Sequence, residues 1–370
     1  MVSAWNASIS ARSLVQTVML ALLCACHASP ASGGSAAVDA AGLWPLPANV
    51  SSGEGTIGVS RAVRVDYDGA PCAVASYVQA RLRETFSTGV GIHDVFLPEN
   101  SAPDGLGPSH SAVCSIDTIR IVAASPVDIP HPATDESYEL TVPSCGQVGT
   151  TAAAQCTSTI EIRAPTAVGA AHATETLLQL VRARAWELVI LNAPWQIADA
   201  PRFVHRGLLL DCSRNFLPID TLRATVRAMA ASKLNVLHWH LTDAPSFPLD
   251  LPSARSLARE GAYSAAETYS VHDVEGLVAY AAERGIRVVP EIDMPGHAFS
   301  WRGGAEGVVA CANAQPWELY CNEPPCGQLD PTLEETFVLV EAVVGDVARM
   351  FPDALMHLGA DEVLNGYGYT

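Results

Sequence analysis

The chain of 370 residues is long enough for two ordinary domains and too long for one small fold. Hydrophobic residues make up 49% of it and charged residues only 16%, a balance that excludes an intrinsically disordered or collagen-like protein. The formal charge of −18 repels phosphate, so we expect no nucleic-acid partner.

The N-terminus has the pattern of a secretory signal peptide. Arg12 precedes an apolar run at positions 14–26, and small residues follow as far as position 35. We assign residues 1–30 to this signal; an uncleaved membrane anchor is the alternative. The run is shorter than the ~20 apolar residues of a membrane span. We therefore expect a mature chain without a membrane span, in the secretory pathway, either lysosomal or extracellular.

Entry into that pathway makes the remaining cysteines candidates for disulfides. Cys145 and Cys156 could link a hairpin, and Cys72 with Cys114 could close a larger loop. Cys212 ends an apolar strand pattern and is expected to be a buried thiol. Three cysteines remain near position 320, and this odd number cannot be paired completely within the group. The eight cysteines after the signal are Cys72, Cys114, Cys145, Cys156, Cys212, Cys311, Cys321 and Cys326.

Residues 40–200 predict a small α+β domain. Apolar and polar residues alternate in its strand-like segments, and a loop rich in Pro, Gly and Ser lies at 98–108. The sequence Asn49-Val50-Ser51 is an acceptor for N-glycosylation. The expected strands are 57–65, 118–123, 137–142 and 159–163, and the expected helices are 73–86 and 167–182.

Residues 201–370 alternate strands and helices, the pattern of a parallel sheet. The first strand shows no polar alternation, so we expect it to be buried on both faces. A complete (β/α)₈ barrel needs ~250 residues, so this segment predicts the first half of a TIM barrel. The expected strands are 204–210, 234–241, 286–292 and 355–358, and the helices are 218–232, 271–284 and 332–350.

Polar and charged residues gather at all four strands, where a barrel directs side chains into one active site. The neighbouring acids Asp361 and Glu362 predict glycoside hydrolysis, which uses paired carboxyl groups. Neighbours on a regular strand point to opposite faces, so the backbone must leave strand geometry here, which Gly359 permits. The other polar residues are His205, Arg206, Asp211, His238, His240, Asp243, Glu291, Asp293, His297 and His357.

Four motifs in this order and spacing resemble the β-N-acetylhexosaminidases of glycoside hydrolase family 20. The resemblance covers the whole chain after the signal. It implies hydrolysis of terminal non-reducing N-acetylhexosamine from glycoconjugates or chitooligosaccharides, without a cofactor. The motifs are Arg202-Phe203-Val204-His205-Arg206-Gly207, His238-Trp239-His240, Asp293-Met294-Pro295-Gly296-His297 and Gly359-Ala360-Asp361-Glu362.

The family mechanism explains how two adjacent acids can share one site. The resemblance implies that the 2-acetamido oxygen of the substrate attacks the anomeric carbon and forms an oxazolinium intermediate. By the same resemblance, Glu362 protonates the leaving oxygen and then activates water, while Asp361 orients the acetamido group. Such a reaction retains the anomeric configuration.

Further roles follow from the resemblance. Asp243 and His297 would form a hydrogen-bonded relay next to Glu362, and Asp293 would support it. Arg206 would hold sugar hydroxyls. Apart from the resemblance, the apolar face of Trp301 predicts stacking against the sugar, with packing in the core as the favoured alternative.

Two other functions remain open from the residues alone. His238 and His240 share one strand face, which allows a metal site like that of barrel amidohydrolases. Their position on the second strand argues against it, so we assign no metal and no cofactor. A catalytically inactive sugar-binding homologue is the second alternative.

The chain departs from the family pattern in three places. Ala360 stands where the family usually has a second glycine, and Tyr367-Gly368 stands where it has a Cys-Trp pair. That absent cysteine is the usual partner of the one matching Cys311, so Cys311 would pair with Cys321 or Cys326 instead. The chain also ends after four barrel strands. We therefore expect a truncated chain that hydrolyses little by itself, and a homodimer only in a full-length form.

Overall fold

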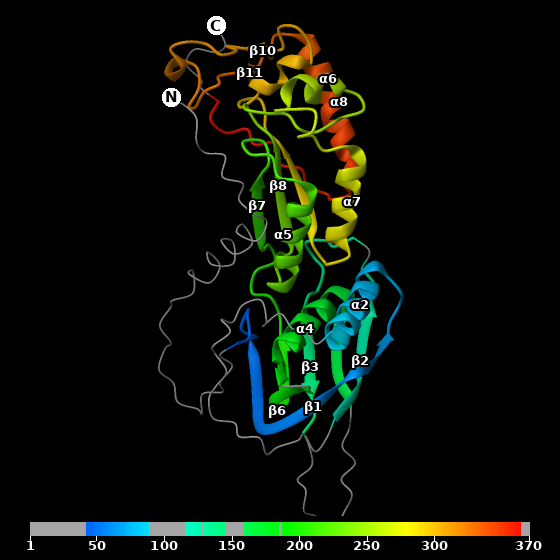
Figure 1. Ribbon diagram of the computed structural model, residues 1–370. Coiled ribbons are helices and arrows are strands. Elements are labelled where there is room, and N and C mark those ends of the chain that lie inside the picture. Colours follow the sequence, from blue (N-terminus) through cyan, green and yellow to red (C-terminus); the bar gives the residue numbers. More distant parts are fainter. Residues whose placement is uncertain (1–41, 89–114, 128, 145–158, 185–186, 364–370) are drawn as a thin grey trace, which may run out of the picture.

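The computed structural model describes residues 42–88, 115–127, 129–144, 159–184 and 187–363. They form an N-terminal and a C-terminal α/β part, which follow one another along the long axis of the molecule (Figure 1). The predicted signal peptide and the 98–108 loop lie outside these residues. None of the helices within the described ranges is long and apolar enough to cross a membrane.

The N-terminal part is built on one six-stranded sheet in the order β1-β2-β4-β3-β6-β5. β1 is long enough to pair with β2 along its second half and with β6 along its first half. The predicted strands all exist, whereas β5 and β6 were not predicted. The strands are β1 (Asn49–Asp68), β2 (Ser115–Ser125), β3 (Tyr138–Val142), β4 (Thr159–Thr166), β5 (Val181–Arg184) and β6 (Glu187–Asp199).

Two helices, α2 (Ala73–Thr88) and α4 (Ala167–Leu180), pack on one face of this sheet (Figure 1). The side chain of Thr166 accepts a hydrogen bond from the backbone N–H of Gly169 and so caps the start of α4. Every residue of α4 is buried, because the helix lies between the sheet and the C-terminal part. Both helices were predicted from the sequence.

The C-terminal part contains a parallel sheet of β7 (Gly207–Asp211), β8 (Val236–Thr242) and β9 (Arg287–Ile292). The helices α5 (Ile219–Ala231), α7 (Val271–Ala282) and α8 (Glu334–Met350) connect and cover its strands, as predicted. Apolar side chains of these helices and strands form a second core, separate from that of the N-terminal part.

Two details of this sheet differ from prediction. The expected fourth strand appears as a single parallel bridge between His357 and Glu291, although the backbone continues beside β9 through hydrogen bonds to His357 and Leu358. The first strand is not buried on both faces, because Leu209 is 50% exposed at the outer strand β7.

Short elements lie in the loops at the carboxyl ends of the strands (Figure 1). They were not predicted, because segments of two to seven residues leave no clear period in the sequence. They are α6 (Arg255–Gly261), the 3₁₀ helices η1 (Phe299–Gly303) and η2 (Trp317–Leu319), and the paired strands β10 (Val309–Ala310) and β11 (Gln328–Leu329).

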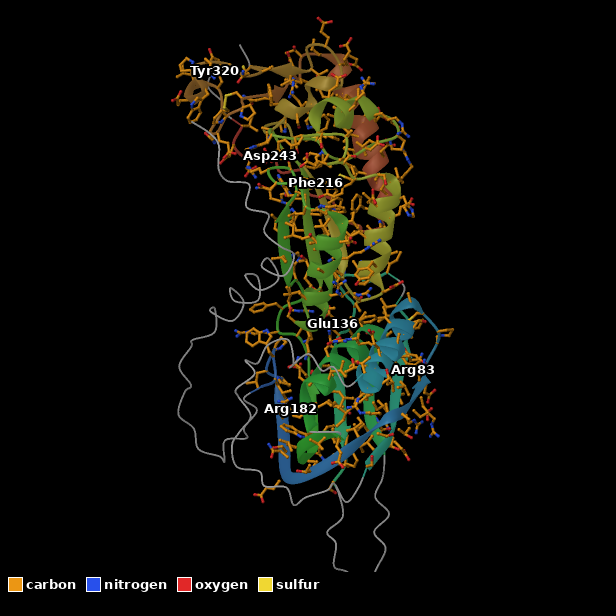
Figure 2. All side chains as sticks on the ribbon, in the orientation of Figure 1. Arg83, Glu136, Arg182, Phe216, Asp243 and Tyr320 are labelled. Carbon is orange, nitrogen blue, oxygen red and sulfur yellow. A yellow bond between two sulfur atoms is a disulfide. The ribbon has the colours of Figure 1, made fainter. Side chains whose placement is uncertain are left out.

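A buried polar cluster joins the two parts at the amino ends of β7 and β8. Glu136 lies at this junction (Figure 2). Its carboxylate contacts Arg206 and His172, and accepts a hydrogen bond from the side chain of Asn235 at 2.7 Å. Nearby, the ammonium of Lys233 donates to Tyr138 and Asp199 of the N-terminal part. We call these seven residues the junction cluster.

Candidate active site

The carboxyl ends of the strands surround one fully buried acid, Asp243, which follows β8. Its Oδ1 accepts a hydrogen bond from the backbone of Ala244 and lies 3.0 Å from Nδ1 of His297. Its Oδ2 lies 3.0 Å from both Nε2 of His240 and the guanidinium of Arg214. Burial alone would raise the pKa of Asp243, but the hydrogen bonds from the two histidines hold it far below its usual value. Asp243 is therefore a permanent anion.

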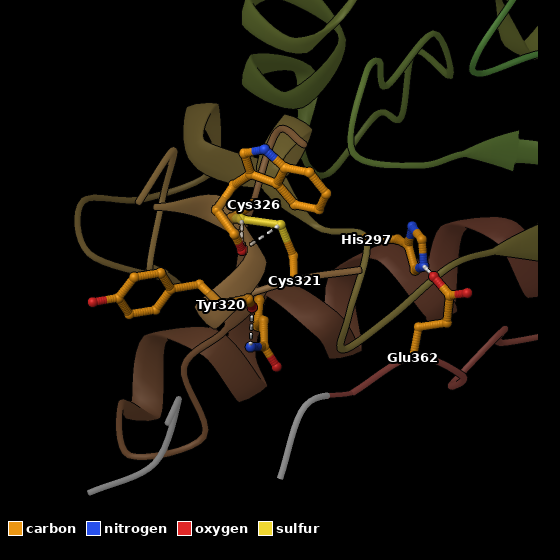
Figure 3. Close-up of a disulfide and its surroundings, with 7 residues drawn as sticks. His297, Tyr320, Cys321, Cys326 and Glu362 are labelled. Atoms are coloured by element: carbon orange, nitrogen blue, oxygen red, sulfur yellow. Dashed lines mark hydrogen bonds and ion pairs between the residues drawn. A yellow bond between two sulfur atoms is a disulfide. The ribbon is translucent and has the colours of Figure 1, made fainter. Parts of the chain in front are cut away.

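His297 links this anion to Glu362 (Figure 3). Its Nε2 lies 3.2 Å from Oε2 of Glu362. The hydrogen bond with Asp243 outweighs burial and raises the pKa of His297 to about 9. The side chain of Glu362 is 45% exposed, so its carboxyl group can meet a ligand while His297 exchanges a proton with it.

The segment 359–362 leaves strand geometry, as the sequence predicted. Gly359, Ala360 and Glu362 have φ angles of 65°, 70° and 54°, all in the left-handed region. This backbone turns both adjacent acids toward the site. One carboxylate oxygen of Asp361 lies within 4.8 Å of a ring nitrogen of His297 and a carboxylate oxygen of Asp293.

Asp293 is a buried acid in the centre of this group, with 3% of its surface exposed. Its Oδ1 has no hydrogen-bond partner among the described residues. Burial raises the pKa of Asp293 to about 6, so the group can hold a proton in mildly acidic solution. A Cβ on Gly359 would lie 1.8 Å from that Oδ1, so only glycine fits beside it.

The prediction that Arg206 belongs to this site is wrong. Arg206 precedes β7 and lies at the amino end of the strand, whereas the site lies at the carboxyl ends. Its guanidinium contacts Glu136 and donates to the backbone oxygens of Phe203 and Lys233. Figure 2 places Glu136 far from Asp243, so Arg206 holds the two parts of the chain together instead.

The sequence analysis missed Arg214, which the structure places in the site. Its Nη1 lies 2.8 Å from Asp211 and 3.0 Å from Asp243, and its Nε lies 3.3 Å from Glu323. About 38% of its side chain is exposed, so the guanidinium borders the open side of the site. The available signal was its place three residues after Asp211, at the end of the first strand.

The structure also corrects the expectation that Trp301 stacks against a sugar. Trp301 is 0% exposed and meets Phe247 edge to face, with the ring centres 5.4 Å apart. Trp239 is likewise fully buried in the core of the C-terminal part. Neither indole offers a face to a ligand.

His238 and His240 do not converge on a place for a shared metal ion. Nε2 of His238 and Nδ1 of His240 both meet Oε2 of Glu291, at 2.5 and 2.8 Å. The other oxygen of Glu291 lies 3.0 Å from Nδ1 of His357. These ring nitrogens are thus engaged by a carboxylate, and we assign no metal ligands among them.

Cysteines shape one border of the site. A disulfide joins Cys321 to Cys326, so the expected pairing of Cys311 with either of them is wrong, and Cys311 is a free thiol. Figure 3 shows the disulfide beside the His297–Glu362 pair, and residues of the 320–328 segment line a small pocket with these two side chains.

The remaining cysteine predictions have mixed outcomes. Cys212 is a buried free thiol, as predicted. Cys72 is also free, which contradicts its pairing with Cys114; its sulfur instead accepts from the backbone N–H of Ala75 at the start of α2. Cys114, Cys145 and Cys156 lie outside the described residues.

Comparison with known proteins places this arrangement in a family. Residues 203–367 match the family model "Glycosyl hydrolase family 20, catalytic domain", and residues 43–180 match "beta-acetyl hexosaminidase like". The chain belongs to glycosyl hydrolase family 20. The two matches cover the C-terminal and N-terminal parts described above, so both parts belong to the family architecture, a TIM-barrel catalytic domain with a preceding domain.

Several curated family 20 proteins are similar in sequence. Beta-hexosaminidase 3 of Arabidopsis thaliana is 35% identical over 87% of this chain and 56% of its own length. Beta-hexosaminidase subunit beta of Mus musculus is 31% identical over 95% of this chain and 60% of its own. A chitooligosaccharidolytic beta-N-acetylglucosaminidase of Bombyx mori is 41% identical over 62% of this chain and 37% of its own.

Solved family 20 structures share the fold. The chitobiase of Flavobacterium johnsoniae superposes with a TM-score of 0.68 at 27% identity, over 87% of this chain and 45% of the other. The β-N-acetylhexosaminidase of Streptomyces coelicolor gives a TM-score of 0.58 at 25% identity, over 86% and 59%. The chain spans about half the length of the curated relatives that it matches.

Proposed function

We propose that the chain provides the acid–base centre of a β-N-acetylhexosaminidase that removes terminal non-reducing N-acetylhexosamine from glycans. One observation carries the proposal: the hydrogen-bonded series Asp243–His297–Glu362, with Asp361 next to Glu362 and directed to the same place. The names of the relatives, hexosaminidases and a chitooligosaccharide-degrading glucosaminidase, support this class of substrate.

The chemistry follows from the two exposed acids. Glu362 protonates the leaving oxygen, with His297 adjusting its proton affinity, and then removes a proton from water. Asp361 holds the acetamido N–H, so that the acetamido oxygen attacks the anomeric carbon and forms the oxazolinium intermediate. Because the nucleophile belongs to the substrate, the protein needs no carboxylate on the opposite side of the sugar.

We assign the binding of sugar hydroxyls to Arg214 in place of Arg206. Its planar guanidinium suits paired hydrogen bonds, and Asp211, Asp243 and Glu323 fix its orientation. Asp293 supports the centre by adding a buried carboxyl group beside His297.

The remaining expectations form part of the same proposal. We assign residues 1–30 to a signal peptide, 40–200 to an N-terminal domain and 201–370 to the first half of a (β/α)₈ barrel. A lysosomal or extracellular location fits the Cys321–Cys326 disulfide and the exposed glycosylation acceptor Asn49. A homodimer is proposed for a full-length form.

Turnover of chromogenic N-acetyl-β-glucosaminide and N-acetyl-β-galactosaminide tests the function. We expect slow release by the 370-residue chain and faster release by a full-length form, in which Glu362→Gln should lower kcat about 10²- to 10⁴-fold with folding intact. Glu335→Gln, a matched change on the exposed surface of α8, serves as the control. The proposal fails if a folded full-length form releases no product, or if its Glu362→Gln variant turns over normally. Nothing among the described site residues favours an inactive sugar-binding protein.

A further inference from the structure

His240 lies on β8 with a carboxylate at each ring nitrogen. Its Nε2 is 3.0 Å from Oδ2 of Asp243, and its Nδ1 is 2.8 Å from Oε2 of Glu291 on β9. Only 6% of His240 is exposed, so water cannot replace either contact.

The two contacts together fix the protonation state of His240. An ionised carboxylate only accepts hydrogen bonds, and a neutral imidazole has one N–H and one lone pair. A neutral His240 would therefore direct its lone pair at one of the two anions. The doubly protonated ring donates to both carboxylates, and this outweighs burial and raises the pKa of His240 to about 10.

His240 in turn anchors the anion of the proposed acid–base centre. Oδ1 of Asp243 contacts His297, and Oδ2 contacts both His240 and Arg214. Glu291, on the far side, is fixed by His238 and by the bridge segment at His357. A continuous series of contacts therefore runs from the interior of the sheet to Glu362.

We propose that His240 is a positioning residue that, held by Glu291, keeps the Asp243 carboxylate oriented toward His297 and supplies a fixed positive charge to the acid–base pair. This inference rests on the proposed function, because the pair matters only if Glu362 transfers protons. It adds His240 and Glu291 to the residues that determine how His297 titrates.

The charges around His240 set the direction of the expected effect. Besides Asp243 and Glu291, it faces Asp211 at the end of β7 and Asp293 after β9, and Arg214 shares Asp243 with it. The titratable groups around His240 are thus four acids, Arg214, and the histidines His238 and His297, which share Glu291 and Asp243 with it. Replacing His240 by glutamine removes one positive charge from this group, so the His297–Glu362 pair should hold its proton to higher pH.

Nuclear magnetic resonance of the wild-type chain tests the charged state without any substrate. With ¹⁵N-labelled histidine, we expect two histidines, His240 and His297, to keep both ring nitrogens protonated at pH 8, and the signals of one of them to vanish in His240→Gln. A neutral His240 at pH 8 overturns the proposal, whether or not the chain hydrolyses glycosides. This readout separates a failure of the inference from a failure of the proposed function.

Kinetics then test the consequence for catalysis. In His240→Gln we expect kcat to fall about ten-fold or more with KM nearly unchanged, and the alkaline limb of the pH profile to move to higher pH. His272→Gln, at an exposed position of α7, should match the wild type in both respects. A His240→Gln variant with the wild-type pH profile contradicts the proposal, because a purely structural role would lower stability without moving that limb.

Discussion

Three residues of the acid–base centre or its neighbours, His297, Ala360 and Glu362, adopt left-handed backbone angles that L-residues avoid. The surrounding contacts stabilise these angles: His297 is held by Asp243, and the turn at Gly359 lies directly on Asp293. Ala360 has no comparable contact with a residue of the acid–base centre. The methyl group that distinguishes it from glycine therefore costs stability without contributing to the site.

Ala360→Gly is expected to stabilise the protein by about 1 kcal/mol, because glycine adopts φ near +70° without the clash of a Cβ. Urea unfolding measures the change. Ala354→Gly, an exposed residue nearby that is not among those with positive φ, should instead lower stability. Equal effects of the two substitutions would contradict the argument from backbone strain.

At the residue scale, the sequence predicted most residues of the acid–base centre. It missed Arg214, whose place depends on where the first strand begins and ends. Adjacent acids after a glycine required a turn, and the φ angles confirm it. Arg206 and Arg214 both flank the first strand, and only its observed start at Gly207 reveals that Arg206 lies at the wrong end. A shift of three residues in a predicted boundary is enough to exchange the two arginines.

Among the helices, α7 has the most complete N-terminal cap. Ser270 accepts a hydrogen bond from the backbone of Asp273, and the Asp273 side chain returns one to the backbone of Ser270. This capping box fixes the helix that packs beside α5 behind the sheet. The sequence predicted a helix at 271–284, and Gly285, which directly follows that range, has a φ of 74°.

Ser270→Ala should destabilise the protein by about 1 kcal/mol, since it leaves backbone N–H groups at the start of α7 without an acceptor. Thermal or urea unfolding gives the measurement. Ser270→Asp should retain most of the stability, because aspartate is an equally good cap. If both variants lose stability alike, the loss comes from something other than the cap.

Other elements could not be predicted because their form depends on distant partners. Residues 355–358 look like a strand in sequence, yet only one bridge to β9 forms, at Glu291. β6 was missed because Asn192 and Pro194 interrupt its apolar pattern, while its pairing with β1, β3 and β5 keeps it in the sheet. Tertiary pairing overrides local pattern in both cases.

At the scale of the whole molecule, the junction cluster is the main polar connection between the two parts. Burial alone would raise the pKa of Glu136, but contacts with His172, Arg206 and Asn235 lower it below its usual value of 4.5. The carboxylate is therefore ionised when the protein is folded. Removing its charge would leave the largely buried guanidinium of Arg206 without a carboxylate partner.

Glu136→Gln is expected to destabilise the protein by about 3 kcal/mol at neutral pH. The pKa of Glu136 is lower in the folded state than in the unfolded state. The contribution of this carboxylate to the free energy of unfolding is therefore present above pH 4.5, and it is lost as the pH falls through the folded-state pKa. The difference in unfolding free energy between wild type and variant should therefore shrink in acid. Glu139→Gln, three residues away and exposed, is the control; a similar loss there would refute the assignment.

The junction cluster also restricts the motion of one part of the chain against the other. Bending one part of the chain against the other would pull Arg206 and Lys233 out of their buried ion pairs, so hinge motion at the amino ends of the strands is unfavourable. At the opposite ends of the strands, the short disulfide-closed loop carries Glu323 to Arg214 at the rim of the site. That exposed ion pair contributes less than the buried pairs of the junction cluster, so the rim of the site is easier to displace than the junction.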